Sequence, residues 1–156
     1  MKNIWLIILL IMLNSCGLIR VSSGSKYDRE KVNKVDFCDL SEFKNELIKT
    51  RLEYSGVDEY WSARGFNDCE LDNAVYLDFR EYYESWKYKL INKQLSRLHE
   101  EYWKRKAVMT VIGRFEMDSV TKYGHLGSNN AQIVVKSVRI NLKSKKIFTD
   151  KNHLQL

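Results

Sequence analysis

Residues 107–117 read Ala-Val-Met-Thr-Val-Ile-Gly-Arg-Phe-Glu-Met, and this stretch decides how the rest of the chain can fold. Its apolar side chains fall on both parities, so we expect a central strand that is covered on both faces. Gly113 lies inside the run, where a glycine predicts a bulge or a strong bend. The other strands must therefore flank this segment on both sides.

Three shorter segments with strand character precede it. Residues 48–54 alternate apolar or small side chains with charged ones, the pattern of a half-buried strand. After a break at Ser55-Gly56, residues 59–66 are rich in aromatic side chains and predict a second strand. Residues 74–79 alternate again and predict a third.

A helix and a fifth strand complete the pattern. Residues 82–106 contain no glycine or proline and carry apolar side chains at helical spacing, which predicts an amphipathic helix. Residues 133–142 predict the fifth strand, and their apolar positions change phase between Val135 and Val138, which indicates a bulge.

Three strands, a helix and two strands form the order of the OB-fold, a five-stranded, partly open Greek-key barrel. We therefore expect a mainly β chain with one long helix between strands three and four, folded as one OB-fold-like domain over residues 35–145. A ferredoxin-like sandwich needs a helix after its first strand, and the short Ser55-Gly56 link leaves no room for one.

The N-terminus predicts export. Ten apolar residues, Ile4 to Leu13, follow Lys2. A membrane-spanning helix needs about 20, so residues 1–15 are expected to be a signal peptide. Leu13-Asn14-Ser15-Cys16 resembles the lipobox of bacterial lipoproteins, which implies cleavage before Cys16 and lipidation of its thiol. The alternative is an ordinary signal peptide with an incidental Cys16.

Lipidation would attach the protein to a membrane of the cell envelope. Gly17, rather than Asp, follows the cysteine, and by resemblance to lipoproteins of bacteria with two membranes this favours the outer membrane. Residues 16–34 contain Ser22-Ser23-Gly24-Ser25 and charged residues, so we expect a flexible tether. Residues 146–156 are expected to be a C-terminal tail.

Two further cysteines, Cys38 and Cys69, remain in the exported part. Outside the cytoplasm such a pair usually oxidises, so we expect a Cys38–Cys69 disulfide that stabilises the fold by roughly 3 to 4 kcal/mol. The three histidines have no ligand spacing and no Cys-x-x-Cys motif is present, so we expect no metal and no cofactor.

The charge balance is mildly basic. The chain carries 26 Lys and Arg against 20 Asp and Glu, a formal net charge of +6. A surplus this small, distributed among many acids, usually indicates a solvated surface, whereas nucleic-acid binding requires basic residues on one face. Nucleic acid is therefore not an expected partner, although anionic lipid headgroups fit the charge.

Four features carry a family resemblance. They are Cys38 before the first strand, Cys69 before the third, Val111 to Phe115 in the fourth, and Tyr123-Gly124-His125-Leu126-Gly127 before the fifth. Over residues 35–142 the chain resembles a family of small exported bacterial proteins, often lipoproteins, of unknown function. The resemblance implies an OB-type barrel with a disulfide, and it implies no activity.

One loop could form a ligand site. Barrels of this type bind ligands with strands two and three and with the loop before strand five, here residues 124–130. The candidate binding residues are Tyr60, Trp61, Arg64, His125, Asn129 and Asn130. The alternative is structural, because paired glycines also supply the positive φ of tight turns and aromatic residues also fill cores.

No catalytic motif is recognisable, since the chain lacks a nucleophile elbow, a phosphate loop and a zinc-binding helix. Three functions remain open. The chain could be a lipid-anchored module that binds a protein or glycan of the envelope, an OB-fold that binds an oligonucleotide or oligosaccharide, or an enzyme built around His125. We expect the first, a non-catalytic binding module.

Overall fold

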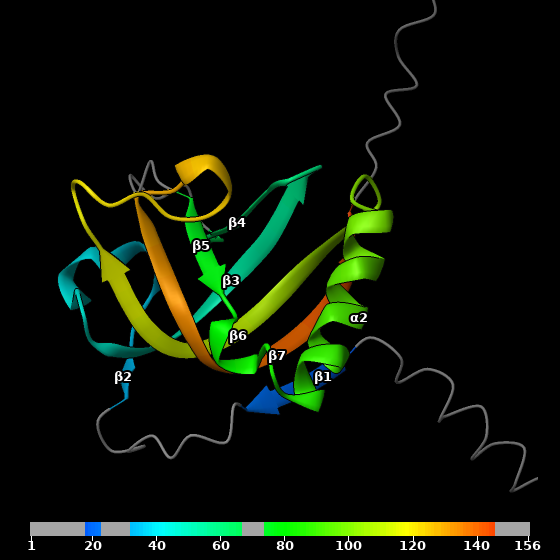
Figure 1. Ribbon diagram of the computed structural model, residues 1–156, viewed down its shortest axis with the longest axis horizontal. Coiled ribbons are helices and arrows are strands. Elements are labelled where there is room, and N and C mark those ends of the chain that lie inside the picture. Colours follow the sequence, from blue (N-terminus) through cyan, green and yellow to red (C-terminus); the bar gives the residue numbers. More distant parts are fainter. Residues whose placement is uncertain (1–17, 23–31, 67–73, 146–156) are drawn as a thin grey trace, which may run out of the picture.

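The computed structural model describes residues 18–22, 32–66 and 74–145, and within them the chain is mainly β (Figure 1). In these ranges, seven strands belong to one sheet, which is accompanied by one α-helix and short 3-10 helices. In chain order the elements are β1 (Leu18–Ser22), β2 (Asn33–Lys34), η2 (Phe37–Phe43), β3 (Leu47–Val57), β4 (Tyr60–Arg64), β5 (Val75–Asp78), η3 (Arg80–Tyr82), α2 (Trp86–Glu100), β6 (Arg105–Met117), η4 (His125–Gly127) and β7 (Ala131–Ser144).

Five of these strands close into a barrel. β3 pairs with β4, β4 with β5, β5 with β7, β7 with β6, and β6 returns to β3. The β5–β7 pair is parallel and the other four pairs are antiparallel. The expectation of a mainly β, barrel-forming chain is thereby confirmed.

β6 is central, as its sequence predicts, because it pairs with β3 and β7 along most of its length. The ladder with β7 shifts register where Ile112 faces Ser137 and Gly113 faces Val135, so Lys136 is the extra residue of a bulge. Both sequence signals for a bulge are confirmed at this single site. A Cβ on Gly113 would come within 2.4 Å of the Val134 carbonyl oxygen, which explains the glycine.

Full coverage of β6 on both faces is wrong. The side chains of Ala107, Met109, Val111 and Phe115 are buried inside the barrel, whereas the outward ones between them are half-buried or, at Arg114, exposed. Thr110 and Ile112 belong to this second set and line a hollow on the outside of the barrel. Because several of the outward positions are apolar, the sequence wrongly predicts that this face is covered.

The helix is shorter than predicted. Ser85 caps α2 by accepting a hydrogen bond from the backbone N–H of Lys87, so the helix starts at Trp86. It ends at Glu100, and a turn at residues 101–104 leads into β6 at Arg105. α2 buries Ile91, Leu95 and Leu98 and lies along one side of the barrel in Figure 1.

The flexible tether predicted for residues 16–34 is wrong where the structure describes that segment. β1 pairs antiparallel with β7 and β2 pairs parallel with β3, so both extend the sheet beyond the barrel. Val21 is buried, and its carbonyl oxygen accepts a hydrogen bond from Ser137 Oγ at 3.2 Å. The serine-rich composition hid a short strand pattern in which Ile19 and Val21 flank Arg20.

Several predictions lie outside the described residues. They concern the signal peptide at residues 1–15, the lipidated Cys16, the rest of the tether at 23–31, Cys69 and the tail at 146–156. Cys38 lies in η2, while its predicted disulfide partner Cys69 is not described, so this pairing stays a prediction.

Candidate functional site

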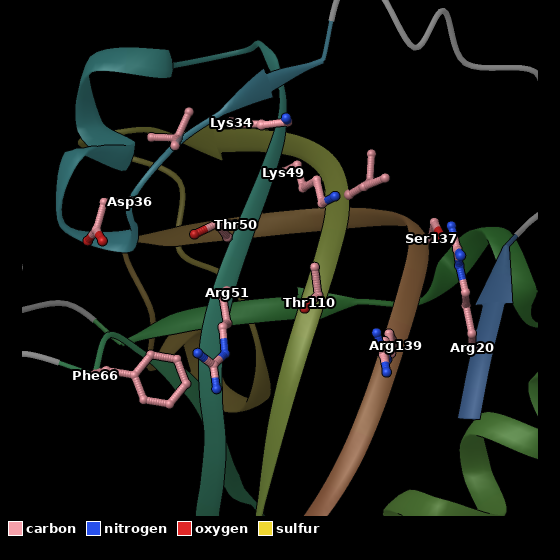
Figure 2. Close-up of a pocket in the computed structure, with 12 residues that line it drawn as sticks. Arg20, Lys34, Asp36, Lys49, Thr50, Arg51, Phe66, Thr110, Ser137 and Arg139 are labelled. Atoms are coloured by element: carbon pink, nitrogen blue, oxygen red, sulfur yellow. The ribbon is translucent and has the colours of Figure 1, made fainter. Parts of the chain in front are cut away.

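A hollow of about 670 Å³ lies on the outer face of β3, β6 and β7, between β1 and β2 (Figure 2). Only one acidic side chain, Asp36, lines it among the described residues. We call this hollow the basic pocket because its charged lining is otherwise cationic: Arg20, Lys34, Lys49, Arg51 and Arg139.

The strand register explains how distant residues meet there. Arg51 on β3 lies opposite Thr110 on β6, Thr110 lies opposite Arg139 on β7, and Arg139 lies opposite Arg20 on β1. These four residues form one row across four strands, and Figure 2 shows them one after another on these strands. Neighbouring strands are about 4.8 Å apart, so the three arginines fall within roughly 15 Å of one another.

A second row crosses the pocket next to the first. Lys34 on β2 lies opposite Lys49 on β3, which lies opposite Ile112 on β6. A smaller hollow of about 230 Å³ adjoins the pocket along the same strands and shares Arg51, Thr110 and Arg139 with it. Positive charge therefore covers a continuous surface.

These cations have no acidic partners in the described part of the chain. The ion pairs found there are elsewhere, such as Lys106 with Glu53 at 2.6 Å. Arg51 instead lies over the ring of Phe66, 4.8 Å from its centroid. The Asp36 carboxylate accepts the backbone N–H of Cys38 at 3.0 Å and so caps η2.

Such a surface has a definite chemistry. A guanidinium offers a planar fork of N–H donors that matches carboxylate and phosphate oxygens, and lysine adds a mobile point charge. Like charges placed directly opposite in a ladder, as in Arg20 and Arg139, destabilise a sheet. An anion between them would convert this repulsion into attraction.

The loop predicted from sequence forms a second region. We call Glu59, Tyr60 and residues 123–130 the loop region. The His125 and Tyr60 rings meet edge to face, with centroids 5.9 Å apart. His125 Nε2 lies 2.8 Å from Glu59 Oε2, and the two side chains are 43% and 71% exposed. Tyr60 and His125 therefore do come together, and Glu59 is a neighbour that sequence reasoning missed.

Trp61 is wrongly assigned to that site. Alternation along β4 turns Tyr60 and Arg64 outward and Trp61 inward, where it is 8% exposed. Its ring lies 4.1 Å from that of His99, and its indole N–H donates to the Asp58 carbonyl oxygen at 2.7 Å. Burial lowers the pKa of the His99 imidazole. Trp61 is a core residue.

Both asparagines of the loop region make hydrogen bonds within the loop. Tyr123 and Asn129 exchange backbone hydrogen bonds of 2.8 and 3.0 Å that close the loop, and Asn129 is buried. Asn130 accepts a hydrogen bond from the Lys122 amine. Gly124 and Gly127 have φ of 76° and 66°, so the positive φ expected of them is confirmed.

Sequence analysis did not find the basic pocket. The alternation in residues 48–54 predicts that Lys49 and Arg51 share one face of a strand. The sequence does not predict that Arg20 lies in a strand, nor the register that places it opposite Arg139. The prediction that the basic residues are distributed among acids is therefore wrong for the five cations of the basic pocket, which share one face.

Comparisons with known family models, curated proteins and solved structures gave no match to this chain. Within the described ranges, no helix is long and apolar enough to cross a membrane. No three His, Cys, Asp or Glu side chains of those same ranges gather as metal ligands.

Proposed function

We propose that this protein is an exported, lipid-anchored binding module whose basic pocket holds an anionic component of the cell envelope. The observation that carries this proposal is the row of Arg51, Arg139 and Arg20 across neighbouring strands without an acidic partner among the described residues. A protein that only needed a stable sheet would gain from replacing one of these arginines.

The ligand class follows from the pocket's shape and charge. The pocket is long enough for one ligand to contact several of its cations at once. This favours a ligand with two or more phosphate or carboxylate groups. The Phe66 ring and Ile112 add apolar surface beside the charges. An anionic glycan or a phosphorylated lipid headgroup has this combination.

The lipid anchor remains part of the proposal. It rests on the apolar segment at residues 4–13 and the lipobox-like end at Cys16. A Cys38–Cys69 disulfide and membership of the family of small exported bacterial proteins that the chain resembles are proposed with it. The strand order, with α2 after the third barrel strand, supports an OB-type barrel.

A second candidate function uses the other region. An OB-type barrel could bind an oligosaccharide or oligonucleotide with β4 and the loop region, and the exposed Tyr60 beside His125 favours this. The exposed Glu59 carboxylate lies beside His125 in this region and would repel phosphate groups. Oligosaccharide fits this surface better than the phosphates of nucleic acid.

Crosslinking in the native envelope, followed by purification of the protein, tests the proposal. We expect an anionic lipid or glycan to crosslink to the parent protein and to be lost from the double variant Arg51→Gln, Arg139→Gln. Lys143→Gln is the matched control, because Lys143 lies on β7 outside the pocket. Crosslinking that survives in the double variant would contradict the assignment of the pocket.

A further inference from the structure

α2 carries an outward stripe that packing of the barrel does not use. Trp86, Lys89, Leu90 and Lys93 follow one another at spacings of three, one and three residues, so they share one side of the helix. Trp86 is 68% exposed and Leu90 is 41% exposed. We call these four residues the α2 outer face.

The opposite side of the helix already provides the packing. Ile91, Leu95 and Leu98 are buried against the barrel, and they are sufficient to hold an amphipathic helix in place. In the described part of the chain, Trp86 and Leu90 stay exposed next to Lys89 and Lys93. They form the combination found on helices that lie at the surface of anionic membranes.

The short distance along the chain from the proposed anchor at Cys16 to β1 also supports contact between α2 and a membrane. β1 starts at Leu18, two residues after Cys16, so the two Cα atoms are at most about 7.6 Å apart. β1 is held to β7 by a regular ladder and also packs against α2, beside which it lies in Figure 1. An acylated Cys16 would therefore bring the bilayer close to α2.

We propose that the α2 outer face lies on an anionic lipid surface, with Trp86 and Leu90 at the level of the headgroups and Lys89 and Lys93 against their phosphates. This inference rests on the proposed lipid anchor. Amphipathic aromatic rings favour the interface between water and hydrocarbon, and lysine is attracted to anionic lipid. The barrel is then seated on the membrane instead of standing away from it on a tether.

Vesicle binding tests the surface without the anchor. The chain is taken from residue 16 with Cys16→Ser, which keeps every described element and removes the lipid. We expect it to sediment with vesicles of phosphatidylglycerol and phosphatidylcholine and to stay in solution with phosphatidylcholine alone. A Trp103→Phe background leaves Trp86 and the buried Trp61, and the emission should shift to shorter wavelength on binding because only Trp86 changes its surroundings.

Variants assign the binding to the proposed residues. Trp86→Ala, and separately Lys89→Glu with Lys93→Glu, should each lower the affinity for the anionic vesicles at least tenfold. Trp103→Ala is the matched control, because Trp103 is 53% exposed but lies after the helix, and it should change the affinity less than twofold. Equal loss in all three would overturn the proposal, as would loss only in Arg51→Gln.

Palmitate labelling of cells that produce the parent or the Cys16→Ser protein separates this inference from the anchor. Labelling that depends on Cys16, combined with no vesicle binding, would overturn the α2 outer face and leave the anchor. Vesicle binding without labelling would overturn the anchor and show that the face binds lipid by itself.

Discussion

The basic pocket and the loop region differ in how their polar groups are used. In the loop region His125 contacts Glu59, Asn130 contacts Lys122, and backbone bonds between Tyr123 and Asn129 close the loop. In the basic pocket, cations from β1, β2, β3 and β7 face one another, and Asp36 is the only acidic side chain among the described lining residues. A glycine-rich motif that stands out in the sequence can thus stabilise a loop, whereas residues that form no recognisable motif can gather in a charged pocket.

The largest expected effect separates Trp61 from its neighbour Tyr60. Trp61→Ala should lower the free energy of unfolding by roughly 3 to 5 kcal/mol, because it removes a buried aromatic side chain. Tyr60→Ala, at a 57% exposed position, should change it by less than about 0.5 kcal/mol. Urea unfolding followed by circular dichroism measures both. A similar loss of unfolding free energy in the two variants would contradict the assignment of Trp61 to the core.

The glycines of the loop should give the next effect. Gly124→Val should destabilise the fold by roughly 1 to 3 kcal/mol, since φ is 76° and a Cβ would lie 2.7 Å from Asn129 Nδ2. His125→Ala should cost less, because its side chain is 43% exposed. Thermal unfolding of the two variants tests the structural interpretation. A harmless Gly124→Val would contradict it.

Relief of repulsion predicts a smaller effect of opposite sign in the basic pocket. Arg139→Gln should leave stability unchanged or raise it by roughly 0.2 to 1 kcal/mol, because Arg20 lies directly opposite. Lys136→Gln on the same strand should lower stability, since Lys136 is ion-paired with the half-buried Glu81. Chemical unfolding at low ionic strength compares them. A clear loss in Arg139→Gln would mean that the arginine already has a structural partner.

The smallest effect is a pH dependence at His99. Its folded-state pKa is lowered by burial, so the unfolded chain binds a proton more readily and stability should fall as the pH drops through the ordinary histidine range. His99→Gln should remove this part of the dependence. Unfolding curves between pH 7.5 and 5 in both proteins provide the check. Identical slopes would show that His99 does not contribute.

Sequence patterns predicted the parts of this fold that depend on local periodicity. The alternation of residues 48–54 and the phase change after Val135 correspond to β3 and to the bulge of β7. β1 was missed because the alternation of Ile19, Arg20 and Val21 is too short to predict a strand without the ladder to β7 that forms it. For the same reason the row from Arg51 to Arg20 was not predictable, since register is a property of paired strands.

The central claim is that anions bind in the basic pocket and not at the loop region. Titration of the isotope-labelled chain from residue 16, carrying Cys16→Ser, with inorganic tripolyphosphate tests it by amide chemical shifts. We predict changes at Arg51, Thr110 and Arg139 that saturate and disappear in the Arg51→Gln, Arg139→Gln double variant, with Tyr60 and His125 unaffected. Changes centred on Tyr60 and His125, or changes that persist in the double variant, would contradict the account.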